Sequence, residues 1–210
     1  MIEATLFDCD GTLVDSERLT SEVLVAYAAE LGVAIGLDEA VAEFTGAKMA
    51  DVVASLERRA ERSLPDGFVP EFRRRMALAF HDRLEPIAGA AELLAALSMP
   101  CCVASSGPRE KIELSLRLTG LRHFFEDRIY SAYDVGRWKP DPGLFLHAAR
   151  AMAVAPERCA VVEDSLLGIE AGVAAGMRVF AYWPGEAAPA LPTGVVRVTR
   201  LDELRGALAS

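Results

Sequence analysis

The chain has 210 residues. At about 150 residues per domain, this length predicts one large domain or one domain with a smaller insert and excludes a long repeat array. Apolar residues make up 52% and charged residues 25% of the chain, so it can bury a core without disulfides or a structural metal, and its net charge of −9 argues against nucleic acid as a partner.

The first predicted element is the short apolar run Ile2–Phe7, which stops at the turn sequence Asp-Cys-Asp-Gly as a buried strand would. No basic leader or signal-length apolar stretch precedes this turn, and no uninterrupted apolar run reaches about 18 residues. We therefore expect a cytosolic (cytoplasmic) protein without a membrane partner. Its cysteines show no CxxC spacing and are expected to be reduced and buried; they are Cys9, Cys101, Cys102 and Cys159.

Residues 16–85 contain no predicted strand. Apolar side chains recur there at helical spacing from Leu19 to Leu31, and three further helical stretches follow at 38–44, 50–62 and 71–84. The strand pattern resumes near Pro86. We expect a Rossmann-like core formed by residues 1–15 and 86–210, with residues 16–85 inserted as a helical domain.

The remaining chain alternates strand-like and helical segments, which predicts an α/β fold with a parallel sheet covered on both faces. The strands are expected at 101–105, 128–130, 159–163, 179–182 and 195–199, and helix start signals follow several of them. Ligands bind open α/β sheets at the carboxyl ends of the strands. The polar residues predicted to lie at those ends are Ser105, Ser106, Lys139, Glu163 and Asp164.

Asp8 and Asp10 lie two positions apart at the end of the first strand, so their side chains are expected to point to the same face. Two carboxylates in one small space either share a proton or hold a hard cation such as Mg²⁺. An ordinary turn is the alternative, because Asp-x-Asp-Gly also suits a loop.

Four segments carry a resemblance to the haloacid dehalogenase superfamily. Residues 7–16 (FDCDGTLVDS) resemble its first signature, in the subgroup of phosphatases and phosphomutases with a helical cap inserted after strand one. Residues 103–107 (VASSG), 139–142 (KPDP) and 162–165 (VEDS) are similar to the second, third and fourth. Residues 105–108 (SSGP) and 137–142 (RWKPDP) look similar to the matching segments of bacterial phosphatases that act on 6-phosphogluconate and related sugar phosphates.

This resemblance implies a phosphatase acting on a small phosphate ester. Asp8 would be the nucleophile that forms an aspartyl phosphate, and Asp10 the general acid and base. Lys139 would supply positive charge to the phosphoryl oxygens. The Ser105 hydroxyl and the backbone N–H groups of Ser106 and Gly107 would hold the phosphate. The alternative is that Ser106 or Gly107 only caps a helix.

The expected cofactor is Mg²⁺, bound by Asp8, Asp10 and Asp164, with Glu163 lying behind these ligands or contacting the ion through water. On the following helix, Gly168 and Gly172 are expected to allow close packing against the sheet.

In the inserted domain, Thr45 and Lys48 lie in a predicted interhelix loop and are the candidates for contacting the leaving group; a plain exposed turn is the alternative. Arg109 and Trp138 flank two motifs and could line the rim. Only three of the 22 basic residues are lysine, namely Lys48, Lys111 and Lys139, and all fall in or beside the predicted site. Such selective use of lysine suggests sites that need a compact ammonium.

Three other functions compete with hydrolysis of a phosphate ester. A β-phosphoglucomutase-like phosphomutase would use the same core residues, but no histidine between Asp15 and Thr20 matches the cap-core residues that restrain hydrolysis in such mutases. A receiver-type phospho-switch needs its acceptor on a later strand and has no helical insert after strand one. Dehalogenation is disfavoured by Asp10, because a departing halide needs no proton.

Overall fold

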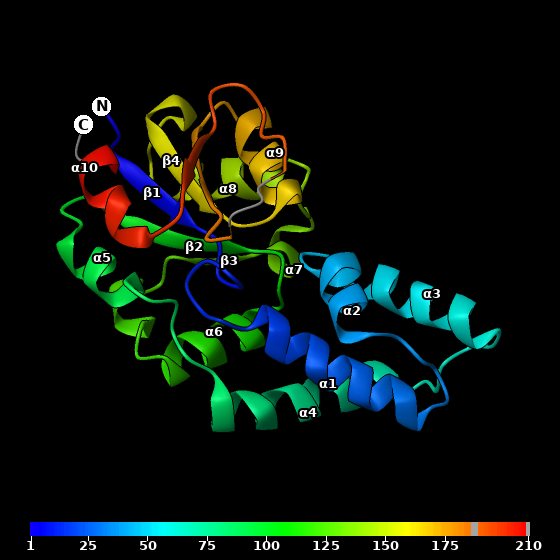
Figure 1. Cartoon of the computed structure of the whole chain (residues 1–210). Helices are drawn as coiled ribbons and strands as arrows, with labels where there is room; N and C mark the ends of the chain where they lie inside the picture. Colours follow the sequence, from blue (N-terminus) through cyan, green and yellow to red (C-terminus); the bar gives the residue numbers. More distant parts are fainter. Residues whose placement is uncertain (186–188, 209–210) are drawn as a thin grey trace. The chain divides into compact units, whose positions relative to one another are not determined.

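The computed structural model describes residues 1–185 and 189–208. They form two compact units, one of Met1–Val14 and Pro86–Ser210 and the other of Asp15–Glu85 (Figure 1). The first, the core unit, contains the whole sheet. The second, the helical unit, begins one residue earlier than the sequence predicts, and its function as a cap stays a prediction.

The core unit is built on a six-stranded sheet in the order β3-β2-β1-β4-β5-β6, in which every neighbouring pair is parallel. The predicted α/β fold with a parallel sheet is therefore confirmed. Because β2 and β4 lie on opposite sides of β1, the chain order reverses beside the first strand, where such folds bind ligands. The strands are β1 Ala4–Phe7, β2 Cys101–Ser105, β3 Ile129–Ser131, β4 Cys159–Glu163, β5 Arg178–Tyr182 and β6 Val196–Val198.

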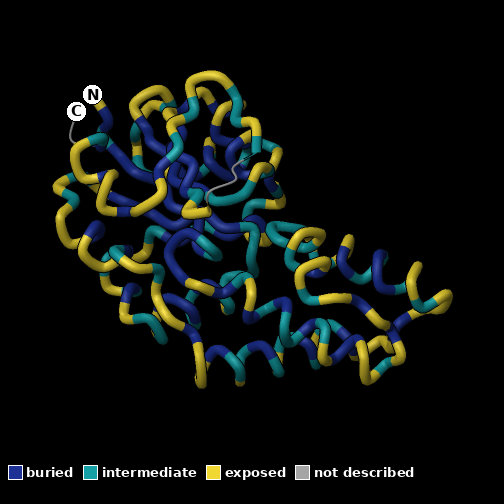
Figure 2. Tube along the Cα trace, viewed as in Figure 1, coloured by how far each residue is buried: buried dark blue, intermediate teal, exposed yellow. Residues whose placement is uncertain are grey.

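Helices cover both faces of this sheet, with α8 and α9 on one side and α5 and α6 on the other (Figure 1). The core helices are α5 Ala90–Ala96, α6 Arg109–Leu118, α7 Ala132–Val135, α8 Gly143–Ala151, α9 Leu166–Ala174 and α10 Leu204–Leu208, with short 3₁₀ turns η1 Arg122–Phe124, η2 Pro156–Arg158 and η3 Leu201–Glu203. Between α8, α9 and the sheet lies a core of small, branched and aromatic side chains, including Leu6, Val161, Phe145 and Ile169. Figure 2 shows the strands as the most buried part of this unit.

The helical unit consists of α1 Glu17–Glu30, α2 Leu37–Phe44, α3 Met49–Ala60 and α4 Phe68–Arg83. Its interior is aromatic: the Tyr27 and Phe68 rings stack at a centroid distance of 5.0 Å, Phe68 stacks in turn on Phe72, and Phe72 and Phe80 of α4 are fully buried. No helix among residues 1–185 and 189–208 is long and apolar enough to cross a membrane.

The insert leaves the core and returns to it through neighbouring residues. Within the core unit, the Ile87 amide donates to the Leu13 carbonyl at 2.9 Å, and Val14 bridges to Pro86. Within the helical unit, the Asp15 amide donates to the Glu85 carbonyl at 2.9 Å. The segment that enters the insert, residues 13–15, is therefore hydrogen-bonded along its length to the segment that leaves it, residues 85–87.

Candidate active site

The candidate site lies where three adjacent strands end. Asp8 directly follows β1, Ser105 is the last residue of β2, and Glu163 is the last residue of β4. The strands are in register, since Phe7 pairs with Val103 on one side and with Val162 on the other. Parallel pairing in this register therefore collects acidic and hydroxyl side chains from three distant segments at one edge of the sheet.

Lys139 connects two of these acidic side chains. Its ammonium donates to the Asp8 Oδ1 and the Glu163 Oε1 atoms, and it lies 5.0 Å from the centre of the Phe145 ring. The side chains of Lys139, Asp8 and Glu163 are only 3%, 10% and 0% exposed. A cation buried this deeply needs charged partners, and here it has two.

Glu163 is fixed through both of its carboxylate oxygens. While Oε1 accepts from Lys139, Oε2 accepts from the Ser165 amide and the Ser165 hydroxyl, each at 2.9 Å. Gly168 on α9 leaves the necessary space, because a Cβ atom there would lie 1.9 Å from the Glu163 carboxyl carbon. The structure thus places Glu163 as a support for Lys139; contact with a metal through water stays a prediction.

The protonation of this pair follows from burial and charge. Burial raises the pKa of Asp8 to about 8; the nearby Glu163 and Asp10 carboxylates act in the same direction, and the Lys139 ammonium opposes them. Burial alone would lower the pKa of Lys139, but the Asp8 and Glu163 carboxylates outweigh it and raise that pKa. Lys139 therefore remains charged at neutral pH, and added positive charge would favour ionised Asp8.

Asp10, two residues after the predicted nucleophile, is paired with a different lysine, Lys111. The Lys111 Nζ atom lies 2.8 Å from Asp10 Oδ1. The second carboxylate oxygen of Asp10 is 3.6 Å from the point where a Cβ atom would stand on Gly107. Asp10 therefore borders the loop that was predicted to hold phosphate.

That loop, residues 105–108, is held by local hydrogen bonds. The Gly107 amide donates to the Ser105 hydroxyl at 3.1 Å, and the Ser131 hydroxyl donates to the Gly107 carbonyl at 2.6 Å. Helix α6 begins at Arg109 with Pro108 as its cap, so neither Ser106 nor Gly107 is the capping residue. Phosphate binding by this loop stays a prediction.

Asp164 is oriented toward the turn that follows β1. Its Oδ1 atom accepts from the Thr12 hydroxyl at 3.0 Å, and a Cβ atom on Gly11 would lie 2.0 Å from its Oδ2 atom. Gly11, whose φ is +75°, therefore provides both a left-handed turn and room for this carboxylate.

The residues of this site fit a divalent cation by charge. With Asp8 ionised, the four carboxylates of Asp8, Asp10, Glu163 and Asp164 carry two more charges than the ammonium groups of Lys111 and Lys139, which leaves two negative charges for a cation to balance. Among the described residues, no group of three histidine, cysteine or acidic side chains is arranged to hold a metal ion by itself. Mg²⁺ suits such a site, because it commonly uses one or two carboxylates and takes its other ligands from water and phosphate.

Three predicted substrate residues have structural contacts of their own. Arg109 donates to the Asp134 carboxylate at 2.7 Å and to the Ile129 carbonyl at 2.8 Å, which ties α6 to β3 and α7. In the helical unit, the Thr45 hydroxyl donates to the Val41 carbonyl at 2.8 Å, and Lys48 caps α3. Substrate contacts by these three residues stay predictions.

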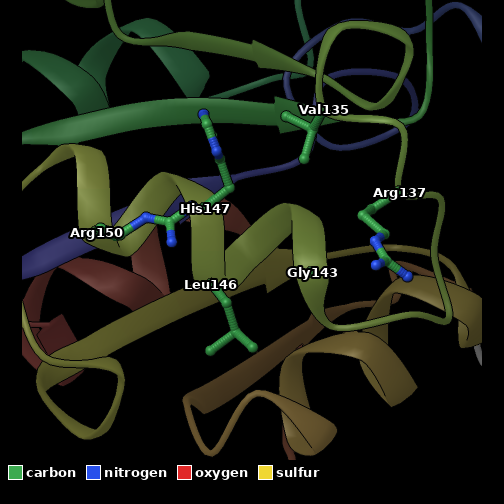
Figure 3. Close-up of a pocket in the computed structure, with 6 residues that line it drawn as sticks. All are labelled: Val135, Arg137, Gly143, Leu146, His147 and Arg150. Atoms are coloured by element: carbon green, nitrogen blue, oxygen red, sulfur yellow. The ribbon is translucent and has the colours of Figure 1, made fainter.

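A hollow of about 320 Å³ lies elsewhere on the core unit, and its lining includes none of the predicted site residues. Figure 3 shows Arg137 and Arg150 at opposite ends of it, with His147 between them on α8. Arg137 pairs with Asp141 at 3.3 Å, and the His147 ring packs edge-on against Tyr130. Arg137 and His147 therefore have partners within the protein and do not by themselves indicate a ligand.

Comparisons with known proteins agree with this geometry. A model of the haloacid dehalogenase-like hydrolases matches residues 2–176. The chain is 41% identical over 183 residues to the 6-phosphogluconate phosphatase of Escherichia coli K12, covering 86% of this chain and 82% of that protein. It is 35% identical over 212 residues to the validoxylamine A 7'-phosphate phosphatase of Streptomyces hygroscopicus subsp. limoneus, covering 98% and 97% of the two.

A solved structure is also similar along nearly the whole chain. The hydrolase of this family from Deinococcus radiodurans R1, determined with bound phosphate and sodium, is 36% identical and superposes with a TM-score of 0.78. The match covers 99% of this chain and 95% of that one.

Proposed function

Because this chain belongs to the haloacid dehalogenase-like hydrolases, we propose that it is a Mg²⁺-dependent phosphatase of small phosphorylated sugars or sugar acids, acting through an aspartyl phosphate on Asp8. The predicted family and the prediction of an enzyme are confirmed. The relative at 41% identity makes 6-phosphogluconate the first substrate to test. A cytosolic location remains part of the proposal, supported by four buried, free cysteines.

The observation that carries this proposal is the buried ion pair of Asp8 and Lys139 next to Asp10. A carboxylate held at the end of a central strand can attack phosphorus only if the approaching negative charges are balanced. Lys139 contacts Asp8 directly and is held in place by Glu163. The charge that stabilises phosphoryl transfer is therefore already in position beside the proposed nucleophile.

In the first half-reaction, an Asp8 oxygen bonds to phosphorus while the bond from phosphorus to the sugar oxygen breaks. Asp10 gives its proton to that departing oxygen. In the second, water attacks the same phosphorus, Asp10 takes a proton from the water, and the Asp8 carboxylate is released with free phosphate. Both carboxyl groups end in their starting states, so the cycle can repeat.

Asp8, Asp10 and Asp164 would hold Mg²⁺, which supplies positive charge to the phosphate oxygens when bound. Within the chain, Thr12 and Gly11 fix the Asp164 carboxylate for that purpose. Lys139, held in place by Glu163, would balance the negative charge of the phosphoryl group during its transfer. The loop at Ser105 would limit where the phosphate can lie.

The test is a panel of phosphate esters assayed for phosphate release with Mg²⁺, including 6-phosphogluconate, neutral hexose phosphates and p-nitrophenyl phosphate. We expect many turnovers per chain on a sugar acid or sugar phosphate, and Asp8→Asn to lose at least about 10³-fold. A single phosphoryl group per chain would indicate a phospho-switch. Conversion of a sugar bisphosphate to its isomer faster than phosphate release would indicate a mutase.

A further inference from the structure

Lys111 forms an ion pair that the proposed chemistry does not yet use. It lies in the first turn of α6, and its ammonium is 2.8 Å from Asp10 Oδ1. The two side chains are only 15% and 13% exposed. Apart from the pairs made by Lys139, the other ion pairs described on the same unit are more exposed; Arg117, six residues further along α6, is 62% exposed in its pair with Glu113.

The low solvent exposure of Lys111 and Asp10 determines how strongly they hold each other. Exposed ion pairs contribute little, because water competes with each contact and the long side chains remain mobile. A largely desolvated lysine and aspartate hold each other more firmly, since separating them would leave a charge in a poorly solvated place. The Lys111 contact therefore restricts the orientation of the Asp10 carboxyl group.

The restricted orientation points toward the predicted phosphate loop. With Oδ1 at Lys111, the Oδ2 atom lies 3.6 Å from the Cβ position on Gly107, and the Ser105 hydroxyl lies 3.5 Å from the same point. The aliphatic part of Lys111 is also near, with its Cδ atom at 3.7 Å. One carboxylate oxygen is thus anchored to α6 while the other borders the place proposed for the substrate phosphate.

The residue type fits this geometry. Of the 22 basic residues, 19 are arginines, whose planar guanidinium commonly grips both oxygens of a carboxylate. A lysine ammonium is a point charge and can pair with Oδ1 without also gripping Oδ2. A lysine here is therefore suited to anchoring the carboxyl group through one oxygen only.

We propose that Lys111 is the positioning residue for Asp10, holding it so that Oδ2 transfers the proton to the sugar oxygen and later accepts one from water. This inference rests on the proposed function. The proton moves from Asp10 to the sugar oxygen as the bond from that oxygen to phosphorus breaks and the bond to Asp8 forms. All groups that take part in this positioning belong to the core unit.

Leaving-group dependence tests the proposal, because a poor leaving group needs the proton and a good one does not. The Lys111→Met variant should lower kcat/KM for the best sugar phosphate about 10²-fold and for p-nitrophenyl phosphate by less than about threefold. Arg117→Met, which removes a charge from the same helix, should change neither. Thermal unfolding of each variant checks the fold, and Lys111→Gln replaces Lys111→Met if the latter does not fold.

A double-mutant comparison shows whether Lys111 acts through Asp10. If it does, adding Lys111→Met to Asp10→Asn should change sugar-phosphate turnover by less than about threefold. Equal losses on both esters from Lys111→Met alone, or an undiminished loss in the Asp10→Asn background, would overturn the positioning assignment while leaving the phosphatase intact. A wild-type protein that releases phosphate from no ester would instead overturn the proposed function and this inference with it.

Discussion

Replacing Gly168 with alanine should damage catalysis through Glu163, although Gly168 lies on a helix behind the site. The new Cβ atom would lie 1.9 Å from the Glu163 carboxyl carbon, and ordinary contact begins near 3.4 Å. The carboxylate must therefore move by about 1.5 Å, the difference between these distances. That movement breaks the two 2.9 Å hydrogen bonds from Ser165 and shifts the partner of Lys139.

The size of both effects follows from these contacts. Disrupting a buried, hydrogen-bonded ion pair costs about 3–5 kcal/mol, so we expect Gly168→Ala to lower the free energy of unfolding by about that amount. Misplacing a catalytic group by about 1 Å can cost about 10²-fold, which we expect in kcat/KM through the shift of Lys139. Gly172→Ala is the matched control, because the nearest atoms to its Cβ atom would be apolar, from Val179 at 2.8 Å and Val161 at 3.4 Å. Such overpacking costs about 1–3 kcal/mol without touching a charge.

The assay compares kcat/KM of the two variants with wild type at a temperature where all three are fully folded, beside their urea unfolding curves. Gly168→Ala should lose both activity and stability, and Gly172→Ala chiefly stability. Adding Gly168→Ala to Glu163→Ala should cost much less stability than it costs the wild type, because no carboxylate remains to be displaced. Full activity in Gly168→Ala, or identical losses in the two glycine variants, would refute the reasoning.

Four further outcomes are expected. In chelator, the stability of Asp8→Asn relative to the wild type should rise by about 4–5 kcal/mol from pH 4 to pH 8 in thermal unfolding, because burial raises the pKa of Asp8 from its ordinary 3.8 to about 8 and each pKa unit corresponds to about 1.4 kcal/mol. The folded state therefore keeps a proton that the unfolded chain releases, and its stability falls as pH rises between those values; an equal gain at both pH values would contradict this. Lys139→Ala should cost about 3 kcal/mol of transition-state stabilisation in kcat/KM, and a loss below about tenfold would make Lys139 a structural charge. Turnover should require Mg²⁺ and be inhibited by Ca²⁺, whose longer bonds and higher coordination number suit a bidentate Asp8, whereas full turnover in chelator would exclude the metal site. Lys48→Ala should weaken kcat/KM for the best sugar phosphate far more than for p-nitrophenyl phosphate, and equal losses would count against a leaving-group contact.

The strands and the residues at their ends could be predicted from the sequence because short apolar runs between turn signals are local patterns. The run 101–105 coincides with β2, and 159–163 coincides with β4. The first strand begins at Ala4, two residues later than the apolar run at Ile2. Strand ends are set by pairing, and Ala4 is the first residue with a partner in β4.

The contacts that organise the site could not be predicted, because they join residues far apart in the sequence. The Lys139 pair with Asp8 spans 131 positions, and its geometry depends on the register of β1 against β4. Gly168 was expected to allow helix–sheet packing, which Gly172 does against Val161 and Val179. Gly168 of α9 also faces the sheet, but its neighbour is the Glu163 carboxyl group, a contact that depends on the side-chain direction at the end of β4. In the sequence, only the rarity of lysine distinguishes Lys111 from the other basic residues.

Because the Ile87 amide is hydrogen-bonded to the Leu13 carbonyl, the chain leaves the core and re-enters it at the same place. Since both connections run side by side, a segment of any length could occupy residues 15–85 without altering the distance that the core backbone must span. Every strand of the sheet lies outside residues 15–85. Insertions, deletions or wholesale exchange between these two points therefore leave the catalytic strands untouched, so the part proposed to recognise the leaving group can diverge while the phosphoryl-transfer chemistry is conserved.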